Sequence, residues 1–370
     1  MKDQSMSISA LVVDDSLLFR KVVRDCLAQI GDVEVIGVAG DGKAAVEKIR
    51  RFRPDVVTLD VEMPGMDGLA VLRQIKRDRL PTKIIMLSAL TERGADATTE
   101  ALSLGAFDFI LKPSHGSPEK NLADLKEQLS QRISAVRRRP TSASKTIKPA
   151  IPRSPRTAMV TKRAVANPSR RAAGLIEAVL IGISTGGPKA LRALLTQLPA
   201  DYSVPIIIVQ HMPPMFTASM ARDIDRHAKL DVVEAADEMP LVGGTAYIAP
   251  GGKHLEVHRV AGSLRARVTD APPERNCKPS VNVMFRSASD ATGGRVLGAI
   301  MTGMGDDGLA GCQHLRNAGG TVWAQDEASC TVFGMPRQII EAGLADRILP
   351  LNQFADALIQ TGQKRLAVCH

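Results

Sequence analysis

Charged and polar residues stand directly after the short apolar runs of the first 127 residues. Asp14 and Asp15 follow the first run, Asp60 ends the third, Ser88 the fourth and Lys112 the fifth. Clustered carboxylates repel one another unless a cation offsets their charge, and Mg²⁺ is a hard ion that prefers oxygen ligands. A carboxylate beside such an ion can attack a phosphoryl group. The set predicts a phosphate-handling site, in which Ser88 would donate to a phosphoryl oxygen and Lys112 would pair with its charge.

A serine, a histidine and two aspartates follow apolar runs in the second half of the chain. Ser184 lies in a G-x-S-x-G segment, residues 182–186, His211 follows the next run, and Asp306 and Asp307 follow a third. A serine hydroxyl needs a neighbouring base to attack a carbonyl, and the base needs an acid to orient it. The pattern predicts a serine hydrolase in which Asp307 or Asp306 orients His211.

Each of these residues also has a plainer structural interpretation. The turn around Ser184 could be a simple connection between strand and helix, and one aspartate of the 306–307 pair could cap the following helix. A dinucleotide-binding turn is excluded, because its middle glycine is replaced by Ser184. The chain order serine, histidine, aspartate differs from that of α/β-hydrolases, so the G-x-S-x-G match does not indicate that superfamily. Geometry must decide whether the three residues act together.

Short apolar runs alternate with amphipathic segments in both halves of the chain. In the first half the runs are 10–13, 33–38, 56–59, 83–87 and 107–111. The segments between them have helical periodicity, as in 17–29, 43–52 and 69–76. In the second half the runs beside the polar residues are 178–183, 206–210 and 296–301, and helices are expected over 189–198 and from about Leu309. The alternation predicts an α/β protein with two doubly wound parallel sheets, which carry their chemistry at the carboxyl ends of their strands.

A basic segment separates the two halves. Residues 128–176 carry 12 Lys or Arg and five Pro but no acidic or aromatic residue, so the rest of the chain has a net charge of 9 − 12 = −3. Such a segment cannot bury a core and has no aromatic ring to stack on a base, which favours a solvated linker over a nucleic-acid partner. The predicted organisation is a domain over 1–130, a linker over 131–176 and a domain over 177–370. The last helix of the first domain is expected to continue to about Val136.

The remaining composition is that of an ordinary globular protein. A chain of 370 residues with 44% hydrophobic content fits two domains. Its five cysteines have no metal-binding spacing, so we expect structural or incidental thiols in a reducing compartment. The first nine residues lack the apolar core of a signal peptide, and no apolar run is long enough to span a bilayer. These features predict a cytoplasmic protein that is not integral to a membrane.

The first half resembles the response-regulator receiver family. The matching segments are VVDDS at 12–16, LDVEMPGMDG at 59–68, MLSA at 86–89 and LKP at 111–113. This resemblance implies a flavodoxin-like fold with Asp60 as the phosphoacceptor and Mg²⁺ held by Asp14, Asp15 and Asp60. A histidine kinase would be the phosphodonor.

The same resemblance implies a switch. Ser88 and Lys112 would contact the phosphoryl group, and Phe109 would change its rotamer on phosphorylation. A plain core role for Phe109 is the alternative.

The second half resembles chemotaxis protein-glutamate methylesterases. The matching segments are IGISTGGP at 181–188, QHMPP at 210–214, PSVNVMF at 279–285, the stretch 297–308 with its TGMGDDG end, and FGMP at 333–336. The resemblance implies that Ser184 is the nucleophile, His211 the base and Asp307, the aspartate directly before glycine, the orienting acid. The backbone amides of Thr185 and Met304 become candidate oxyanion donors. No cofactor is expected for the esterase chemistry.

Two positions depart from that family's pattern. Ile183 stands where alanine is common, and Met215 stands where glycine is common and could reshape the substrate groove. The resemblance implies a phosphorylation-regulated enzyme that hydrolyses glutamate methyl esters, and deamidates glutamines, on methylated chemoreceptors.

Three other functions compete with this one. A response regulator with a DNA-binding output would need a helix-turn-helix after the linker, where strands and helices alternate instead. A scaffold with an inactive esterase fold is disfavoured by the intact serine, histidine and aspartate. A general lipase or protease would act on short esters and not on methylated receptors.

Overall fold

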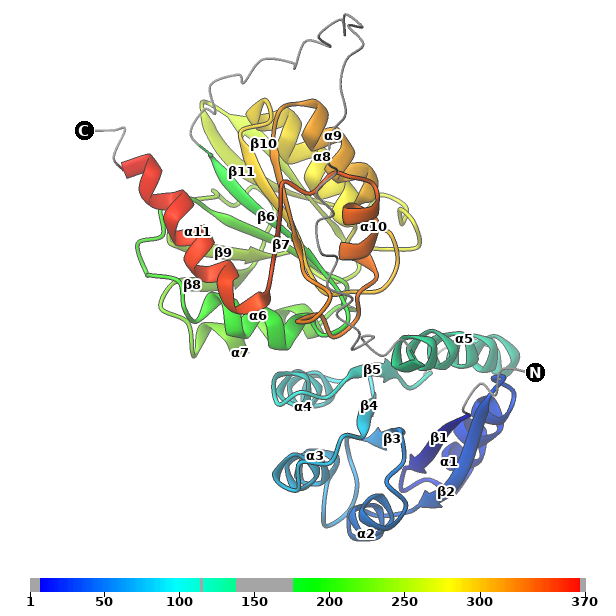
Figure 1. Cartoon of the computed structure of the whole chain (residues 1–370). Coiled ribbons are helices and arrows are strands. Elements are labelled where there is room, and N and C mark those ends of the chain that lie inside the picture. Colours follow the sequence, from blue (N-terminus) through cyan, green and yellow to red (C-terminus); the bar gives the residue numbers. More distant parts are fainter. Residues whose placement is uncertain (1–6, 114–115, 138–175, 367–370) are drawn as a thin grey trace, which may run out of the picture.

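The computed structural model describes residues 7–113, 116–137 and 176–366, which form two α/β domains (Figure 1). The helix α5 (Pro118–Arg137) ends the first domain and runs into the range expected for the linker. Residues 138–175, which make up most of that predicted linker, lie outside the described residues.

The first domain has a five-stranded parallel sheet in the order β2-β1-β3-β4-β5. Its strands are β1 (Ile8–Val13), β2 (Val33–Ala39), β3 (Val56–Asp60), β4 (Lys83–Ser88) and β5 (Asp108–Leu111). The inner strand β3 is buried throughout, which explains its continuous apolar run. The strand order is that of the flavodoxin-like fold, as the sequence predicts.

The other helices of this domain are α1 (Leu17–Ala28), α2 (Gly42–Phe52), α3 (Gly68–Arg77) and α4 (Glu92–Ser103). Each begins after a side chain that accepts a hydrogen bond from the backbone N–H three residues on, namely Ser16, Asp41, Asp67 and Thr91. Such caps satisfy donors that the first helical turn leaves free.

The second domain has a seven-stranded parallel sheet in the order β14-β13-β12-β6-β7-β9-β8. Its strands are β6 (Ala178–Ile183), β7 (Ile206–Gln210), β8 (Asp231–Glu234), β9 (Thr245–Ile248), β12 (Val296–Ile300), β13 (Thr321–Gln325) and β14 (Arg347–Leu349). The helices are α6 (Gly187–Leu195), α7 (Phe216–Asp225), α8 (Val281–Thr292), α9 (Leu309–Asn317), α10 (Met335–Glu341) and α11 (Leu351–Leu366). Strands β6 and β7 have the predicted bounds. The predicted fold class is confirmed for both domains.

An antiparallel hairpin interrupts the parallel pattern of the second domain. It consists of β10 (His254–Val260) and β11 (Ser263–Thr269), joined by a two-residue turn at Ala261 and Gly262 with positive φ. The hairpin packs against α8. The sequence interpretation did not include it.

The two domains are in contact through α4 and β5 of the first and α6 and α7 of the second (Figure 1). The Ser103 hydroxyl donates to the Asp223 carboxylate at 2.8 Å, and the Ser219 hydroxyl donates to Asp96. The rings of Phe109 and Phe216 stack with centroids 4.9 Å apart. The contact therefore includes both polar and aromatic pairs.

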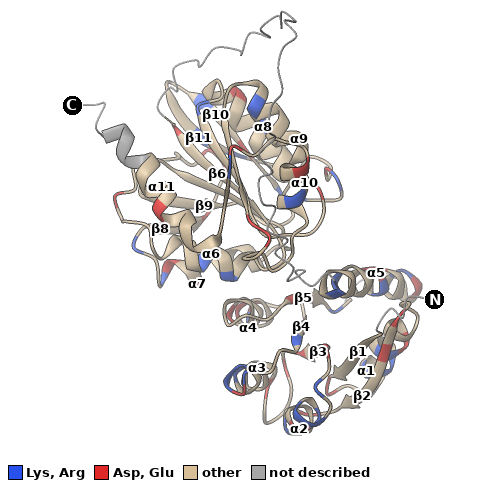
Figure 2. Cartoon of the chain, in the orientation of Figure 1, with Lys and Arg blue, Asp and Glu red and all other residues tan. Residues whose placement is uncertain are grey.

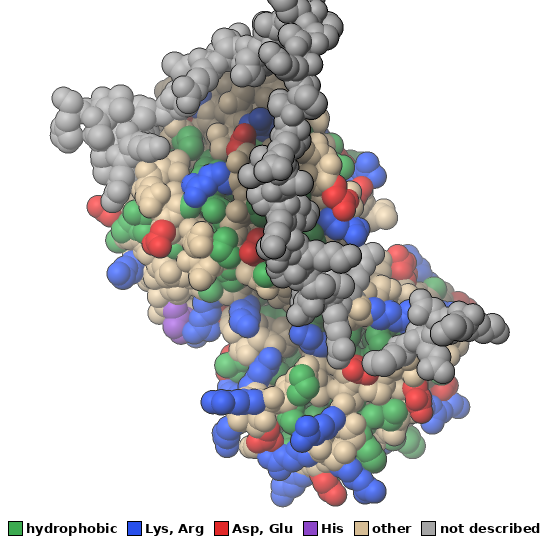
Figure 3. All heavy atoms as spheres, viewed as in Figure 1, with side chains coloured by type: hydrophobic (Ala, Val, Ile, Leu, Met, Phe, Trp, Pro, Cys, Tyr) green, Lys and Arg blue, Asp and Glu red, His purple; other side chains and the backbone are tan. Residues whose placement is uncertain are grey.

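Charges of both signs are distributed over the helices of the two domains (Figure 2). In the space-filling view, Lys and Arg gather over α2 and α3 of the first domain (Figure 3). These helices carry Arg50, Arg51, Lys76 and Arg77 in their last turns, where positive charge complements the helix dipole. Within the described residues, no helix is both long enough and apolar enough to cross a membrane.

Candidate active site

The pairing of β6 with β7 brings Ser184 and His211 to neighbouring strand ends. Ile183 is paired with Gln210, and the His211 backbone N–H donates to the Ile183 carbonyl at 3.2 Å. The next residues of the two strands therefore leave the sheet side by side. Ser184 and His211 line one cavity of about 300 Å³.

The turn after β6 keeps Ser184 out of the left-handed backbone region. Gly186 has a φ of 83°, whereas Ser184 is not among the described residues with positive φ. Ser184 therefore lacks the positive φ that would mark a strained nucleophile elbow. The Ser184 N–H donates to the Thr302 carbonyl at 3.0 Å, and the Gln210 side chain donates to the Ser184 carbonyl at 3.0 Å. These bonds fix the backbone beside the hydroxyl.

The loop after β12 packs directly against the serine. A Cβ atom at Gly303 would lie 2.8 Å from the Ser184 Cβ and 2.5 Å from the Met335 sulfur. Glycine is therefore required where this loop approaches the first strand end.

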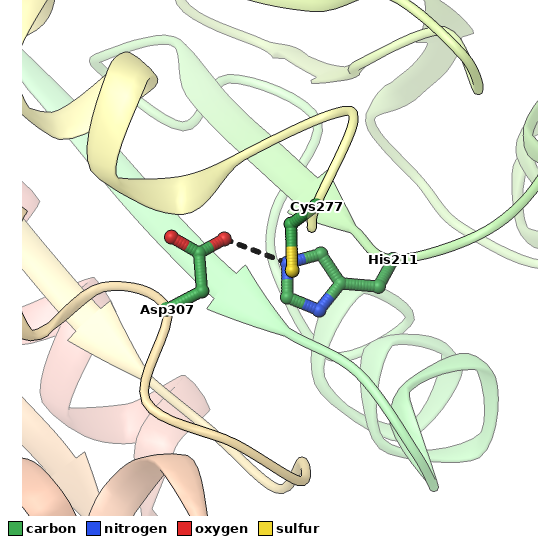
Figure 4. Close-up of side chains that lie close together, drawn as sticks. All are labelled: His211, Cys277 and Asp307. Atoms are coloured by element: carbon green, nitrogen blue, oxygen red, sulfur yellow. Dashed lines mark hydrogen bonds and ion pairs between the residues drawn. The ribbon is translucent and has the colours of Figure 1, made fainter. Parts of the chain in front are cut away.

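Asp307 lies against the imidazole of His211. Its Oδ2 is 2.8 Å from His211 Nε2, and the residue is 3% exposed (Figure 4). The carboxylate also accepts from the backbone N–H groups of Val281 and Asn282, at 2.7 and 3.1 Å, and from the Ser280 hydroxyl at 2.9 Å. The N-terminus of α8 thus stabilises a buried negative charge.

Burial alone would raise the pKa of Asp307, but the bond to His211 and the amides of Val281 and Asn282 lower it below the usual range. Burial likewise disfavours protonated His211, but Asp307 and Cys277 outweigh it and raise its pKa to about 9. A negative carboxylate therefore faces an imidazole that binds its proton tightly.

The neighbouring Asp306 points elsewhere. Its carboxylate is 3.2 Å from the guanidinium of Arg275 and is partly exposed. Of the two aspartates considered from the sequence, the structure brings only Asp307 to His211.

Two residues that support Asp307 carried no role in the sequence interpretation. Ser280 donates to its carboxylate, and Asn282 Oδ1 accepts from the backbone N–H groups of Gly308 and Gly311, at 3.0 and 2.7 Å. Asn282 thereby fixes the loop that carries Asp307. Both residues belong to the PSVNVMF segment at 279–285. The resemblance of this segment to the esterase family is the sequence signal that could have indicated a role for them.

Cys277 also faces His211 and Asp307 (Figure 4). Ligand atoms of the three side chains lie within 4.8 Å of one another. Among the described residues, Cys26, Cys277, Cys312 and Cys330 are free thiols. The sequence did not indicate that one of them would border the serine and histidine.

The first domain closes one side of the cavity. Thr185 and Met304, the candidate oxyanion donors, line it together with Asp108, Phe109 and Arg132 of the first domain. The Thr185 hydroxyl donates to Asp108 Oδ2 at 2.8 Å, next to the predicted nucleophile. The face that holds Ser184 is therefore covered by the receiver-like half.

The predicted phosphate site is assembled at the carboxyl ends of β1, β3 and β5. Carboxylate oxygens of Asp14, Asp15 and Asp60 lie within 4.8 Å of one another. Lys112 Nζ is 2.7 Å from Asp14 and 2.8 Å from Asp60. Burial raises the pKa of Asp60 to about 6, against the opposing effect of Lys112. A set of three carboxylates with hard oxygen donors fits a Mg²⁺ ion.

Of the three switch candidates, Lys112 lies in this site, whereas Ser88 and Phe109 occupy other places. Ser88 is fully buried, and its hydroxyl donates to the Gly94 carbonyl at 3.2 Å, at the start of α4. Phe109 is 6% exposed and stacks on Phe216 of the other domain. Phe109 therefore belongs to the contact between the domains as well as to the core.

Comparisons with known proteins agree with both halves of the sequence analysis. Residues 10–122 match the family model described as response regulator receiver domain, and residues 179–358 match that described as CheB methylesterase. Three curated relatives share the name protein-glutamate methylesterase/protein-glutamine glutaminase. They come from Desulfotalea psychrophila, Nocardioides sp. and Trichodesmium erythraeum.

These relatives align along nearly the whole chain. The first is 45% identical over 96% of this chain and 98% of its own length. The second is 47% identical over 95% of both chains, and the third 42% identical over 95% of this chain and 97% of its own. The order of the domains is therefore shared as well as their sequences. The chain belongs to the protein-glutamate methylesterase/protein-glutamine glutaminase family, with an N-terminal receiver domain.

Proposed function

We propose that Ser184, His211 and Asp307 hydrolyse the methyl esters of glutamate side chains on chemoreceptors. The observation that carries this proposal is the shared cavity of Ser184 and His211, with Asp307 2.8 Å behind the imidazole. The substrate class comes from the names of the relatives and from the matched esterase family.

The hydrogen bond to Asp307 uses Nε2 of His211, which leaves Nδ1 for the serine (Figure 4). Nδ1 takes the proton of the Ser184 hydroxyl while its oxygen bonds to the ester carbonyl carbon. The carbonyl becomes a tetrahedral oxyanion, for which the Thr185 and Met304 amides are the candidate donors. Asp307 holds the imidazole in the required tautomer and stabilises the imidazolium.

The intermediate then breaks its bond to the methoxy oxygen. His211 gives its proton to that oxygen, methanol leaves, and the glutamyl group remains on Ser184 as an ester. A water molecule, deprotonated by His211, attacks this ester and releases glutamate and the free serine. A glutamine side chain follows the same route with ammonia as the leaving group.

Replacing the nucleophile tests the triad. Ser184→Ala should abolish methanol release from methylated receptor membranes, because no other hydroxyl would take the acyl group. Phosphorylation of Asp60 should persist in this variant and serves as the control for a folded receiver domain. Methanol release at an undiminished rate would refute the proposal.

We further propose that the receiver domain blocks the cavity until Asp60 is phosphorylated. Asp108 and Phe109 line the cavity, and Asp108 accepts a hydrogen bond from Thr185 beside the serine. Phosphorylation would shift the population toward an arrangement in which these contacts are broken. A phosphodonor should therefore raise the esterase rate of the full chain, and an unchanged rate would count against blocking.

In the receiver domain we propose that Asp14, Asp15 and Asp60 hold Mg²⁺, with a histidine kinase as the phosphodonor. The bound ion would offset the charge of the carboxylates and of the incoming phosphoryl group. Lys112 already contacts Asp14 and Asp60 and would pair with the phosphoryl group. Asp60→Asn should remove phosphorylation and with it the activation of the esterase.

A further inference from the structure

An imidazole, a thiol and a carboxylate converge beside the cavity, which His211 and Cys277 line. Ligand atoms of His211, Cys277 and Asp307 lie within 4.8 Å of one another (Figure 4). Nitrogen, sulfur and oxygen donors of these types are the usual protein ligands of Zn²⁺. We propose that His211, Cys277 and Asp307 form an inhibitory binding site for a borderline-soft divalent ion, Zn²⁺ above all.

The thiol is held in place by a tight turn. The backbone groups of Glu274 and Cys277 bond to each other in both directions, at 3.1 and 2.8 Å. Arg275 and Asn276 between them have φ values of 53° and 59°, as in a two-residue hairpin turn of type I′. Cys277 therefore has a defined position over His211.

Two ion pairs fasten this turn to the surrounding structure. Glu274 accepts from Arg286 of α8 at 2.9 Å, and Arg275 pairs with Asp306 at 3.2 Å. The first pair ties the turn to the helix whose N-terminus binds Asp307. The second ties it to the residue next to Asp307. The three candidate ligands are thus carried by connected elements.

The charge and the dimensions suit Zn²⁺. A thiolate and a carboxylate would neutralise the two charges of the ion, with the imidazole neutral. Zinc-to-ligand bonds of about 2.0–2.3 Å place ligand atoms roughly 3.3–3.8 Å apart in a tetrahedral site. The 2.8 Å pair of His211 and Asp307 would open slightly to admit the ion.

The site also has an open side. His211 and Cys277 both line the cavity, which gives the ion an entry path and leaves room for water as a fourth ligand. The other anchor, Asp307, is already negative and oriented by the N-terminus of α8.

A bound ion would remove the base. A neutral imidazole that binds a metal through Nε2 carries its proton on Nδ1, so it has no lone pair for the Ser184 hydroxyl. The ion would also replace the hydrogen bond between Asp307 and the imidazole, because it would bind the carboxylate itself. Inhibition should therefore be reversible when a chelator removes the ion. This consequence depends on the proposed triad, whereas the binding itself does not.

Binding is tested with Co²⁺ as a spectroscopic probe on the full chain, in excess Mg²⁺ to occupy the receiver site. One equivalent of Co²⁺ should produce a thiolate-to-metal charge-transfer band. The band should be absent in Cys277→Ser and in Cys277→Ala, and present in Cys330→Ser, which replaces another partly exposed thiol outside the cavity. A band that persists without Cys277, or no band in the unaltered chain, would overturn the site.

Inhibition is tested by titrating Zn²⁺ into the methanol-release assay, each variant normalised to its own rate with chelator. Loss of a ligand should raise the Zn²⁺ concentration for half inhibition by at least about tenfold in Cys277→Ser, compared with Cys330→Ser. Equal inhibition of the two variants would overturn the proposal. Because the Co²⁺ band does not require turnover, failure of the triad proposal would leave the band unchanged and is distinguishable.

Discussion

At the scale of single residues, the two adjacent aspartates 306 and 307 have opposite surroundings. Asp307 is buried, accepts from the start of α8 and contacts His211, whereas Asp306 reaches out to Arg275. Only a carboxylate at position 307 is placed to stabilise positive charge on the imidazole.

This difference predicts unequal effects of the same substitution. Asp307→Asn should lower the rate of methanol release by about 10⁴-fold, since an amide neither holds the correct tautomer nor stabilises the imidazolium. Asp306→Asn should leave the rate close to that of the unaltered chain. Both variants are compared at equal concentration after circular dichroism shows equal folding. A larger loss in Asp306→Asn would reassign the acid.

The raised pKa of His211 predicts an alkaline rate profile. As the proposed base, His211 would act only when neutral, and Asp307 and Cys277, against the effect of burial, raise its pKa to about 9. The value of kcat/KM should therefore increase as the pH rises toward 9. Cys277→Ala removes one of the raising interactions and should move the increase to lower pH. The profiles are recorded with a chelator of transition metals, and a profile unchanged by Cys277→Ala would contradict the assignment.

At the scale of elements, the turn from β6 into α6 depends on a glycine. Gly186 has a φ of 83°, and a Cβ there would lie 2.4 Å from the Thr331 side chain. Gly262, in the β10–β11 turn, has a φ of 87° but nothing within 4 Å of its Cβ position. The two glycines share a backbone conformation and differ in their contacts.

Alanine substitutions at Gly262 and Gly186 distinguish the cost of backbone strain from the cost of a steric clash. Gly262→Ala should cost about 1–2 kcal/mol of unfolding free energy, because it places a side chain in the left-handed region. Gly186→Ala should cost about 1–3 kcal/mol more, because Thr331 has to move. Urea unfolding of the second domain measures the loss of unfolding free energy in each variant. Equal losses would show that the Thr331 side chain moves aside at no cost.

The same elements show what could be predicted from sequence. The bounds of β6 and β7 can be predicted because each is a continuous apolar run whose end is marked by a polar residue, Ser184 after β6 and Gln210 in β7. Their parallel pairing then makes Ser184 and His211 neighbours. The hairpin β10–β11 differs from the predicted parallel strands, because its half-buried strands alternate polar and apolar residues and lack a continuous apolar run.

Contacts between distant segments could not be predicted. Cys277 meets His211 from a turn at Arg275 and Asn276, which ion pairs join to Arg286 and Asp306. The spacing of residues in the sequence does not indicate such a long-range contact. The bond between Asp108 and Thr185 joins two domains and likewise leaves no periodic signal.

At the scale of the whole molecule, the contact between the domains should set the resting activity. Asp108→Ala removes the acceptor of the buried Thr185 hydroxyl bond, and such bonds to charged groups contribute about 1.5–3 kcal/mol. The ratio of closed to open molecules should fall by about tenfold or more, and the unphosphorylated esterase rate should rise accordingly. The fully phosphorylated rate should not change.

A matched control exists within the receiver domain. Asp55 accepts from the Ser9 hydroxyl at 2.7 Å, in an exposed bond of similar length that lies within the receiver domain. Asp55→Ala should leave the unphosphorylated rate unchanged. If Asp55→Ala activates as much as Asp108→Ala does, general loosening of the receiver explains the effect and the specific contact does not.

Asp108 and Phe109 are consecutive residues of β5, and both contact the esterase domain. In a chimera, the receiver of an unrelated regulator would replace the first domain. That receiver would still be phosphorylated, but it would lack the contacts that Asp108 and Phe109 make with the esterase domain. We expect the chimera to be phosphorylated normally and to have a high esterase rate whether or not it is phosphorylated. An exchange of receivers that preserves control would therefore have to carry β5 across together with the surface it contacts, Thr185 and Phe216.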